Sequence, residues 1–111
     1  MILPRVSIIV CTRNRADSLR ETLASIGRCE VPLDLPAELL VVDNGSTDHT
    51  RQVVEEARLA NVPVRYVLEP KAGLSRARNR GLAETAGEII LFTDDDVRVH
   101  ENWIDSMCRP I

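Results

Sequence analysis

Four short apolar runs alternate with segments of helical character, and this alternation restricts the fold more than any other feature of the chain. The runs are rich in β-branched residues and nearly continuous in hydrophobicity, which is typical of strands buried on both faces. Right-handed crossovers join such strands into a parallel sheet. We therefore expect an α/β fold, an α/β/α sandwich with a mostly parallel, Rossmann-like sheet. The four runs are 6–11, 38–42, 64–68 and 88–93.

The segments between the runs place apolar residues at the spacing of one helical face. Ser18 and Glu21 are three residues apart and predict a capping box at the start of the first helix. Gly27 fits the end of that helix, and the two prolines that follow predict a connecting loop. The expected helices span about 16–26, 47–60 and 74–85, and a further one begins near 102.

Polar side chains follow three of the four predicted strands. Thr12 comes after the first strand, Asp43 after the second, and three aspartates at 94–96 after the fourth. Parallel sheets bind ligands outside the carboxyl ends of their strands, at the point where strand order reverses. Three segments that are far apart in the sequence are therefore expected to meet at one edge of the sheet.

Asp94, Asp95 and Asp96 are the most concentrated charge in the chain. Like charges at this spacing raise one another's pKa unless a cation or hydrogen-bond donors offset the repulsion. Carboxylate oxygens are hard ligands that suit Mg²⁺ or Mn²⁺, and these ions in turn bind phosphate oxygens. The alternative is a solvated acidic turn without a ligand.

Length and charge exclude several classes of protein. The chain has 111 residues, enough for one small domain, and its net charge of −3 disfavours a nucleic-acid-binding protein. Its three cysteines form no CxxC pair, which favours a reducing, cytoplasmic setting. The apolar run 6–11 is too short for a signal peptide or a membrane span. For a longer parent protein, peripheral attachment to the inner face of the membrane is the alternative.

Four segments together resemble the amino-terminal half of a family 2 inverting glycosyltransferase with the GT-A fold. They occur in the order and at the spacing of that family, and the resemblance covers essentially the whole chain. An isolated Asp-x-Asp pair would be weak support, whereas the four segments together are specific. They are 6–15 (VSIIVCTRNR), 40–48 (LVVDNGSTD), 73–81 (GLSRARNRG) and 92–97 (FTDDDV).

The resemblance implies a site for the nucleotide of a sugar donor. By position, Asp43 matches the carboxylate that accepts a hydrogen bond from the base, commonly from N3–H of uracil. Thr12 and Arg15 match the first loop, which borders the nucleoside. Arg78 and Asn79 match a segment that borders the nucleotide.

The resemblance also implies roles for the three aspartates. Asp94 and Asp96 match the two acids of the DxD motif, with Asp94 near the ribose and the metal and Asp96 on the metal that bridges the diphosphate. Asp95, between them, is grouped with the nucleotide-binding residues. The implied cofactor is Mn²⁺ or Mg²⁺, which stabilises the departing nucleoside diphosphate as a Lewis acid.

The implied activity is transfer of a sugar from a nucleotide-diphospho-sugar, with a UDP-sugar favoured, to an unknown acceptor such as a glycan, a lipid or a small molecule. In this family the general base comes from a segment well downstream of the DxD motif. We therefore expect 1–111 to be a partial GT-A domain, the nucleotide-binding half, that binds donor and metal without turnover. The alternative is a non-catalytic nucleotide- or metal-binding module.

Other functions and features are less favoured. A phosphatase with an aspartate nucleophile would carry its Asp-x-Asp pair after the first strand, and no GxGxxG or GxxxxGK[ST] loop is present. Arg76, Arg78 and Arg80 cannot share one helical face, so at most two of them reach a ligand. An exposed sheet edge would favour dimerisation.

Overall fold

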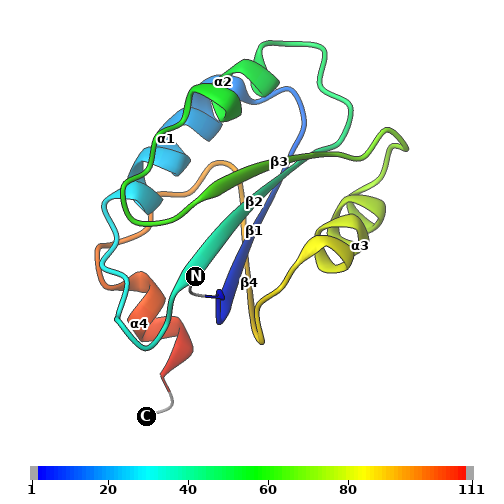
Figure 1. Ribbon diagram of the computed structural model, residues 1–111. Helices are drawn as coiled ribbons and strands as arrows, with labels where there is room; N and C mark the ends of the chain where they lie inside the picture. The colour runs from blue at the N-terminus through cyan, green and yellow to red at the C-terminus, as the bar shows by residue number, and fades with distance from the viewer. Residues whose placement is uncertain (1–2, 110–111) are drawn as a thin grey trace.

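The four predicted strands all form in the computed structural model, which describes residues 3–109, and they join into one parallel sheet (Figure 1). They are β1 (Val6–Thr12), β2 (Ala37–Asp43), β3 (Val64–Leu68) and β4 (Ile89–Thr93). Their order across the sheet is β3-β2-β1-β4. The chain adds β2 and β3 on one side of β1 and then places β4 on the other. Strand order thus reverses at β1 and β4, and the carboxyl ends of these strands are the expected ligand position.

Helices cover both faces of the sheet (Figure 1), which confirms the predicted α/β/α sandwich. Side chains of a strand point alternately to opposite faces, so each strand contributes to two cores. Ile8 and Val10 of β1 belong to the larger core, whereas Ile9 packs with Ala77 in the smaller one. The larger core lies under α1 (Ala16–Gly27), α2 (Thr50–Glu56) and α4 (Trp103–Cys108), and the smaller core under α3 (Leu74–Glu84).

The apolar stripe predicted for the first helix is confirmed. Leu19, Leu23 and Ile26 of α1 are at most 2% exposed. Burial of each such side chain contributes about 1.5–3 kcal/mol relative to its exposed state, so this stripe fixes α1 to the sheet. On the opposite face, α3 approaches the sheet closely at Gly81, where an added Cβ atom would stand 2.8 Å from Cγ2 of Ile9.

The second helix is shorter than the predicted 47–60. Oδ1 of Asp48 accepts a hydrogen bond from the backbone N of Thr50 at 3.0 Å, and α2 begins there. Ala57 has extended dihedral angles (φ −66°, ψ 126°) and ends the helix. The chain then turns so that Leu59 packs beside Gly27 at the end of α1. Tertiary packing therefore overrides the helical pattern of residues 57–60.

The predicted capping box of the first helix is wrong. The hydroxyl of Ser18 donates a hydrogen bond to the backbone O of Asp95 at 3.0 Å, and Glu21 pairs with Arg98. The start of α1 is instead held by Asp48, whose Oδ2 accepts a hydrogen bond from the backbone N of Ala16 at 3.2 Å. One carboxylate thus holds the first turns of both α1 and α2.

The face of β4 that looks toward α3 is partly open, because α3 packs over β1 and β2. Phe92, which pairs with Ile9 in the sheet register, is 42% exposed on this face. Within the described residues, no helix is both long enough and apolar enough to cross a membrane.

Candidate nucleotide and metal site

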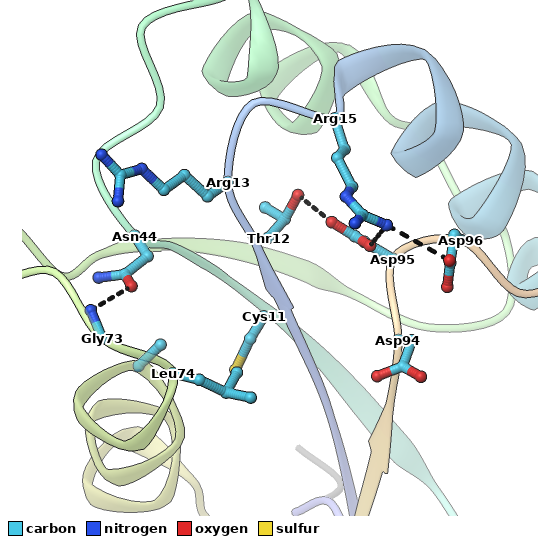
Figure 2. A pocket seen from close by; sticks show the side chains of 11 residues that line it. Cys11, Thr12, Arg13, Arg15, Asn44, Gly73, Leu74, Asp94, Asp95 and Asp96 are labelled. Atoms are coloured by element: carbon cyan, nitrogen blue, oxygen red, sulfur yellow. Dashed lines mark hydrogen bonds and ion pairs between the residues drawn. The ribbon is translucent and has the colours of Figure 1, made fainter.

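A cavity of about 540 Å³ lies at the carboxyl ends of β1 and β4, and we call it the carboxyl-end cavity (Figure 2). Its walls come from the end of β1 and the loop after it, the residue after β2, the start of α3 and the acidic segment after β4. The three segments expected to converge do so here. The lining residues are Cys11, Thr12, Arg13, Arg15, Asn44, Gly73, Leu74, Ala77, Asp94, Asp95 and Asp96.

Asp94, Asp95 and Asp96, here called the acidic triplet, are not equivalent. Asp95 is only 7% exposed, and its Oδ2 accepts a hydrogen bond from Oγ1 of Thr12 at 2.8 Å. Its backbone O also accepts a hydrogen bond from Oγ1 of Thr22 at 2.9 Å. Asp94 and Asp96 are exposed. The middle aspartate therefore anchors the acidic segment to β1 and α1, and the outer two are accessible to a ligand.

Arg15 points from the start of α1 toward the acidic triplet (Figure 2). Its Nη1 lies 3.3 Å from Oδ2 of Asp96 and 3.5 Å from Oδ1 of Asp95. This positive charge offsets part of the repulsion among the aspartates. Sequence position had suggested a role for Arg15 beside the nucleoside, whereas its contacts here are with the acids.

Asn14 turns the loop after β1 through a left-handed backbone conformation with φ 54°. Asparagine adopts this conformation more readily than most residues. Oδ1 of Asn14 accepts hydrogen bonds from the backbone N of Thr47 at 2.7 Å and of Asp48 at 3.3 Å, which ties the loop to the β2–α2 connection. Arg13 and Arg15, on either side of Asn14, extend to opposite sides of β1 (Figure 2). Sequence reasoning did not single out Arg13, although it lies within the segment 6–15.

Asp43 lies at the same edge of the sheet, paired with Thr12 in the register of β1 and β2. It is 2% exposed and does not line the carboxyl-end cavity, whereas Asn44 does. Oδ1 of Asp43 accepts a hydrogen bond from the backbone N of Ser46 at 2.9 Å, and Oδ2 accepts one from the Tyr66 hydroxyl at 2.6 Å. Burial and the adjacent Asp43 carboxylate raise the pKa of Tyr66 to about 12. The phenol therefore stays protonated and holds the carboxylate in place.

Asn44 holds the loop between β3 and α3 against the end of β2. Its Nδ2 donates hydrogen bonds to the backbone O of Glu69 at 3.0 Å and of Lys71 at 2.8 Å, and its Oδ1 accepts one from the backbone N of Gly73 at 3.0 Å. Gly73 has φ 131°, a conformation that favours glycine. This loop sets the start of α3 at the wall of the cavity, where the helix dipole favours an anion.

Arg78 lines a second cavity of about 280 Å³ beside the first, and the two share Cys11, Leu74 and Asp94. Its Cζ lies 5.9 Å from the centroid of the Phe92 ring. Arg80 instead approaches Glu69, with 3.8 Å between Nη1 and Oε1. Arg78 and Arg80 thus have different neighbours, Phe92 and Glu69.

The donor set of the acidic triplet fits a hard divalent cation that shares its coordination with a substrate. Among residues 3–109, no group of three or more histidine, cysteine or acidic side chains is arranged to hold a metal ion. Mg²⁺ typically uses only one or two carboxylates together with substrate phosphates and water. The exposed carboxylates of Asp94 and Asp96 match that requirement. The nearby Cys11 does not, because burial raises the pKa of its thiol and disfavours the thiolate.

Comparison with protein families decides the wider identity of the chain. The model of glycosyl transferase family 2 matches residues 7–111. The chain belongs to this family. Among curated relatives, the glycosyltransferase AglE of Haloferax volcanii is 32% identical over 104 residues, which are 93% of this chain and 34% of AglE.

Solved structures of glycosyltransferases resemble the chain in fold. Staphylococcus aureus TarS 1–349 in complex with UDP superimposes with a TM-score of 0.82 at 30% identity, over 93% of this chain and 30% of that chain. The mannosyltransferase PcManGT of Pyrobaculum calidifontis, in complex with GDP-Man and Mn²⁺, gives a TM-score of 0.73 at 36% identity, over 86% of this chain and 28% of that chain. The family 2 chain described here thus spans about a third of the length of such relatives.

Proposed function

We propose that this family 2 chain binds the nucleotide-diphospho-sugar donor of a metal-assisted inverting glycosyltransferase, with a UDP-sugar favoured. The observation that carries the proposal is the carboxyl-end cavity, which joins two exposed carboxylates, the start of α3 and the loop after β1. The complexes of TarS with UDP and of PcManGT with GDP-Man and Mn²⁺ support a donor of this class. In this proposal the acceptor is a glycan, a lipid or a small molecule, and the carboxyl-end cavity does not bind it.

Asp94 and Asp96 would hold a divalent cation, Mn²⁺ or Mg²⁺, together with the diphosphate of the donor. When bound, such a cation stabilises the negative charge that develops on the departing nucleoside diphosphate. Gly73 and Leu74, at the start of α3, line the same cavity, and the N-terminus of a helix favours phosphate. Asp95 and Thr12 keep the acidic segment fixed to β1, so that the two outer carboxylates are oriented before the donor arrives.

Asp43 is the proposed partner of the nucleobase. Each of its oxygens already accepts one hydrogen bond, from Ser46 or from Tyr66, but a carboxylate oxygen has two lone pairs and accepts a second. The Tyr66 hydroxyl fixes the orientation of the carboxylate. A base N–H that reached Asp43 would meet an acceptor of fixed orientation, although the loop around this carboxylate must first open, since Asp43 is 2% exposed and Asn44 lines the cavity in its place.

Calorimetric titration of the chain with UDP and with GDP, each with and without Mn²⁺, tests the proposal. We expect binding that depends on Mn²⁺ and is stronger for UDP. Asp96→Asn and Asp94→Asn keep the shape of the side chains while removing the charge, and each should abolish the contribution of Mn²⁺.

A matched control removes a carboxylate that does not line the cavity. Asp17 lies in the first turn of α1 and is 88% exposed, so Asp17→Asn should leave nucleotide and Mn²⁺ binding unchanged. Nucleotide binding that is absent from the unaltered chain, or that persists with Mn²⁺ after Asp96→Asn, would overturn the proposal.

A further inference from the structure

We propose that Arg15 is a displaceable internal cation for Asp96: its guanidinium occupies the carboxylate until a divalent cation arrives, and it then turns to the diphosphate of the donor. The inference rests on the proposed function and adds to it an order of events. In this inference Arg15 couples the binding of the metal to the binding of the donor. Its sequence position suggested only that it lies beside the nucleoside.

The contacts of Arg15 place its charge where a metal ligand is needed. Nη1 lies 3.3 Å from Oδ2 of Asp96 and 3.5 Å from Oδ1 of Asp95, so one nitrogen serves two carboxylates. Both distances are ordinary for ion pairs, and the guanidinium does not form two parallel hydrogen bonds with either carboxylate. A cation that binds Asp96 on this side must move the guanidinium or share the carboxylate with it.

The side chain of Arg15 can leave Asp96 while the backbone of Arg15 stays in place. Its backbone O accepts a hydrogen bond from the backbone N of Leu19 at 2.9 Å, which belongs to the first turn of α1. Its side chain is 56% exposed, and that of Asp96 is 53% exposed, so water competes for both partners. A solvent-exposed ion pair of this kind is weak. The guanidinium can therefore leave Asp96 without disturbing the fold.

Asp94 and Asp96 differ in whether their side chains have a partner. In the described part of the chain, no hydrogen bond or ion pair engages the side chain of Asp94, whereas Asp96 is paired with Arg15. A cation can approach Asp94 directly, whereas at Asp96 it must either displace the arginine or share the carboxylate with it. A released guanidinium remains within the same cavity, and it binds phosphate through two parallel hydrogen bonds.

If Arg15 moves from Asp96 to the diphosphate in this way, the metal and the donor bind cooperatively. The metal frees Arg15 for the diphosphate, and the diphosphate draws Arg15 away from the metal ligand. By linkage, each partner then raises the affinity of the chain for the other by the same factor. Removing the guanidinium should strengthen the binding of the metal alone and weaken that coupling.

The experiment compares Arg15→Gln with the unaltered chain at 0.15 M salt, where charges more than about 8 Å apart are largely screened. Electron paramagnetic resonance of free Mn²⁺ gives the affinity for the metal alone. Loss of a weak ion pair predicts that Arg15→Gln binds Mn²⁺ about two- to five-fold more tightly without nucleotide. Calorimetry with UDP at saturating Mn²⁺ should show weaker binding of UDP to the same variant.

Arg20→Gln is the control, because Arg20 forms an ion pair of similar length with Asp17 on the same helix, at 3.5 Å. It should leave both affinities unchanged. Unchanged or weaker Mn²⁺ binding by Arg15→Gln, or equal tightening by Arg20→Gln, overturns the exchange while leaving the metal site intact. Failure of the unaltered chain and of both variants to bind Mn²⁺ overturns the proposed metal function and the exchange with it.

Discussion

Replacement of each aspartate of the acidic triplet in turn should separate a structural carboxylate from two ligand-binding ones. Asp95 is 7% exposed and Thr12 is 4% exposed, and the hydrogen bond between their side chains is 2.8 Å long. Asp95→Ala removes the acceptor and leaves the Thr12 hydroxyl buried without it. Asp94 and Asp96 are exposed, and their replacement leaves no buried group unpaired.

The magnitude follows from the kind of bond that is lost. A hydrogen bond to a charged acceptor contributes about 1.5–3 kcal/mol, and the Arg15 ion pair adds little because the guanidinium is solvated. We expect Asp95→Ala to lower the free energy of unfolding by about 2–3 kcal/mol. For Asp94→Ala and Asp96→Ala we expect changes below about 1 kcal/mol. A domain stable by roughly 5–15 kcal/mol would register this difference clearly.

Urea denaturation followed by circular dichroism measures the three free energies of unfolding under one set of conditions. Asp95→Asn is the control, because the amide oxygen still accepts the Thr12 hydrogen bond and should recover much of the lost stability. The reasoning is refuted if Asp95→Ala unfolds within about 0.5 kcal/mol of Asp94→Ala. Metal titration of the same proteins should show the opposite ranking, with the larger losses for the outer two.

Three further predictions concern the loops and the sheet edge. Asn14→Ala should be less stable than Asn14→Gly by about 1 kcal/mol in urea denaturation, because only alanine is strained at φ 54°; equal stabilities would argue against strain. The Thr50 hydrogen bond lowers the pKa of Asp48, so the stability from this carboxylate is present above its unfolded pKa of about 3.9 and is lost as pH falls through the folded pKa. Asp48→Asn should therefore lose less stability in acid titrations as pH falls below about 3.9, and an unaltered pH dependence would contradict this. Phe92→Lys should shift any dimer toward monomer in light scattering, since it charges the open face of β4; a dimer that persists would place the contact elsewhere.

The strands and the edge at which they converge could be predicted because their signals are local. Each strand is a continuous apolar run, and the polar residues directly after the runs follow from the rule for parallel sheets. The stripe of Leu19, Leu23 and Ile26 likewise appears in the sequence as a helical period. These features do not depend on a partner far away in the chain.

The features that sequence reasoning missed depend on distant partners. Ser18 has the spacing of a capping residue, but its hydroxyl bonds to Asp95, 77 positions away. Three identical aspartates give no sign that the middle one is buried while its neighbours are exposed. The contact of Arg15 with Asp96 spans 81 positions and depends on the turn at Asn14. Such pairings arise only when the loops are assembled in three dimensions.

Amide chemical shifts of the chain during titration with UDP and Mg²⁺, which is diamagnetic, test the central claim most directly. If one donor is bound by loops brought together at a single edge, shifts should cluster at 12–15, 43–46, 73–77 and 94–96 and saturate at one common concentration. Shifts confined to one of these segments, or centred on the amino ends of the strands, would contradict a shared donor site.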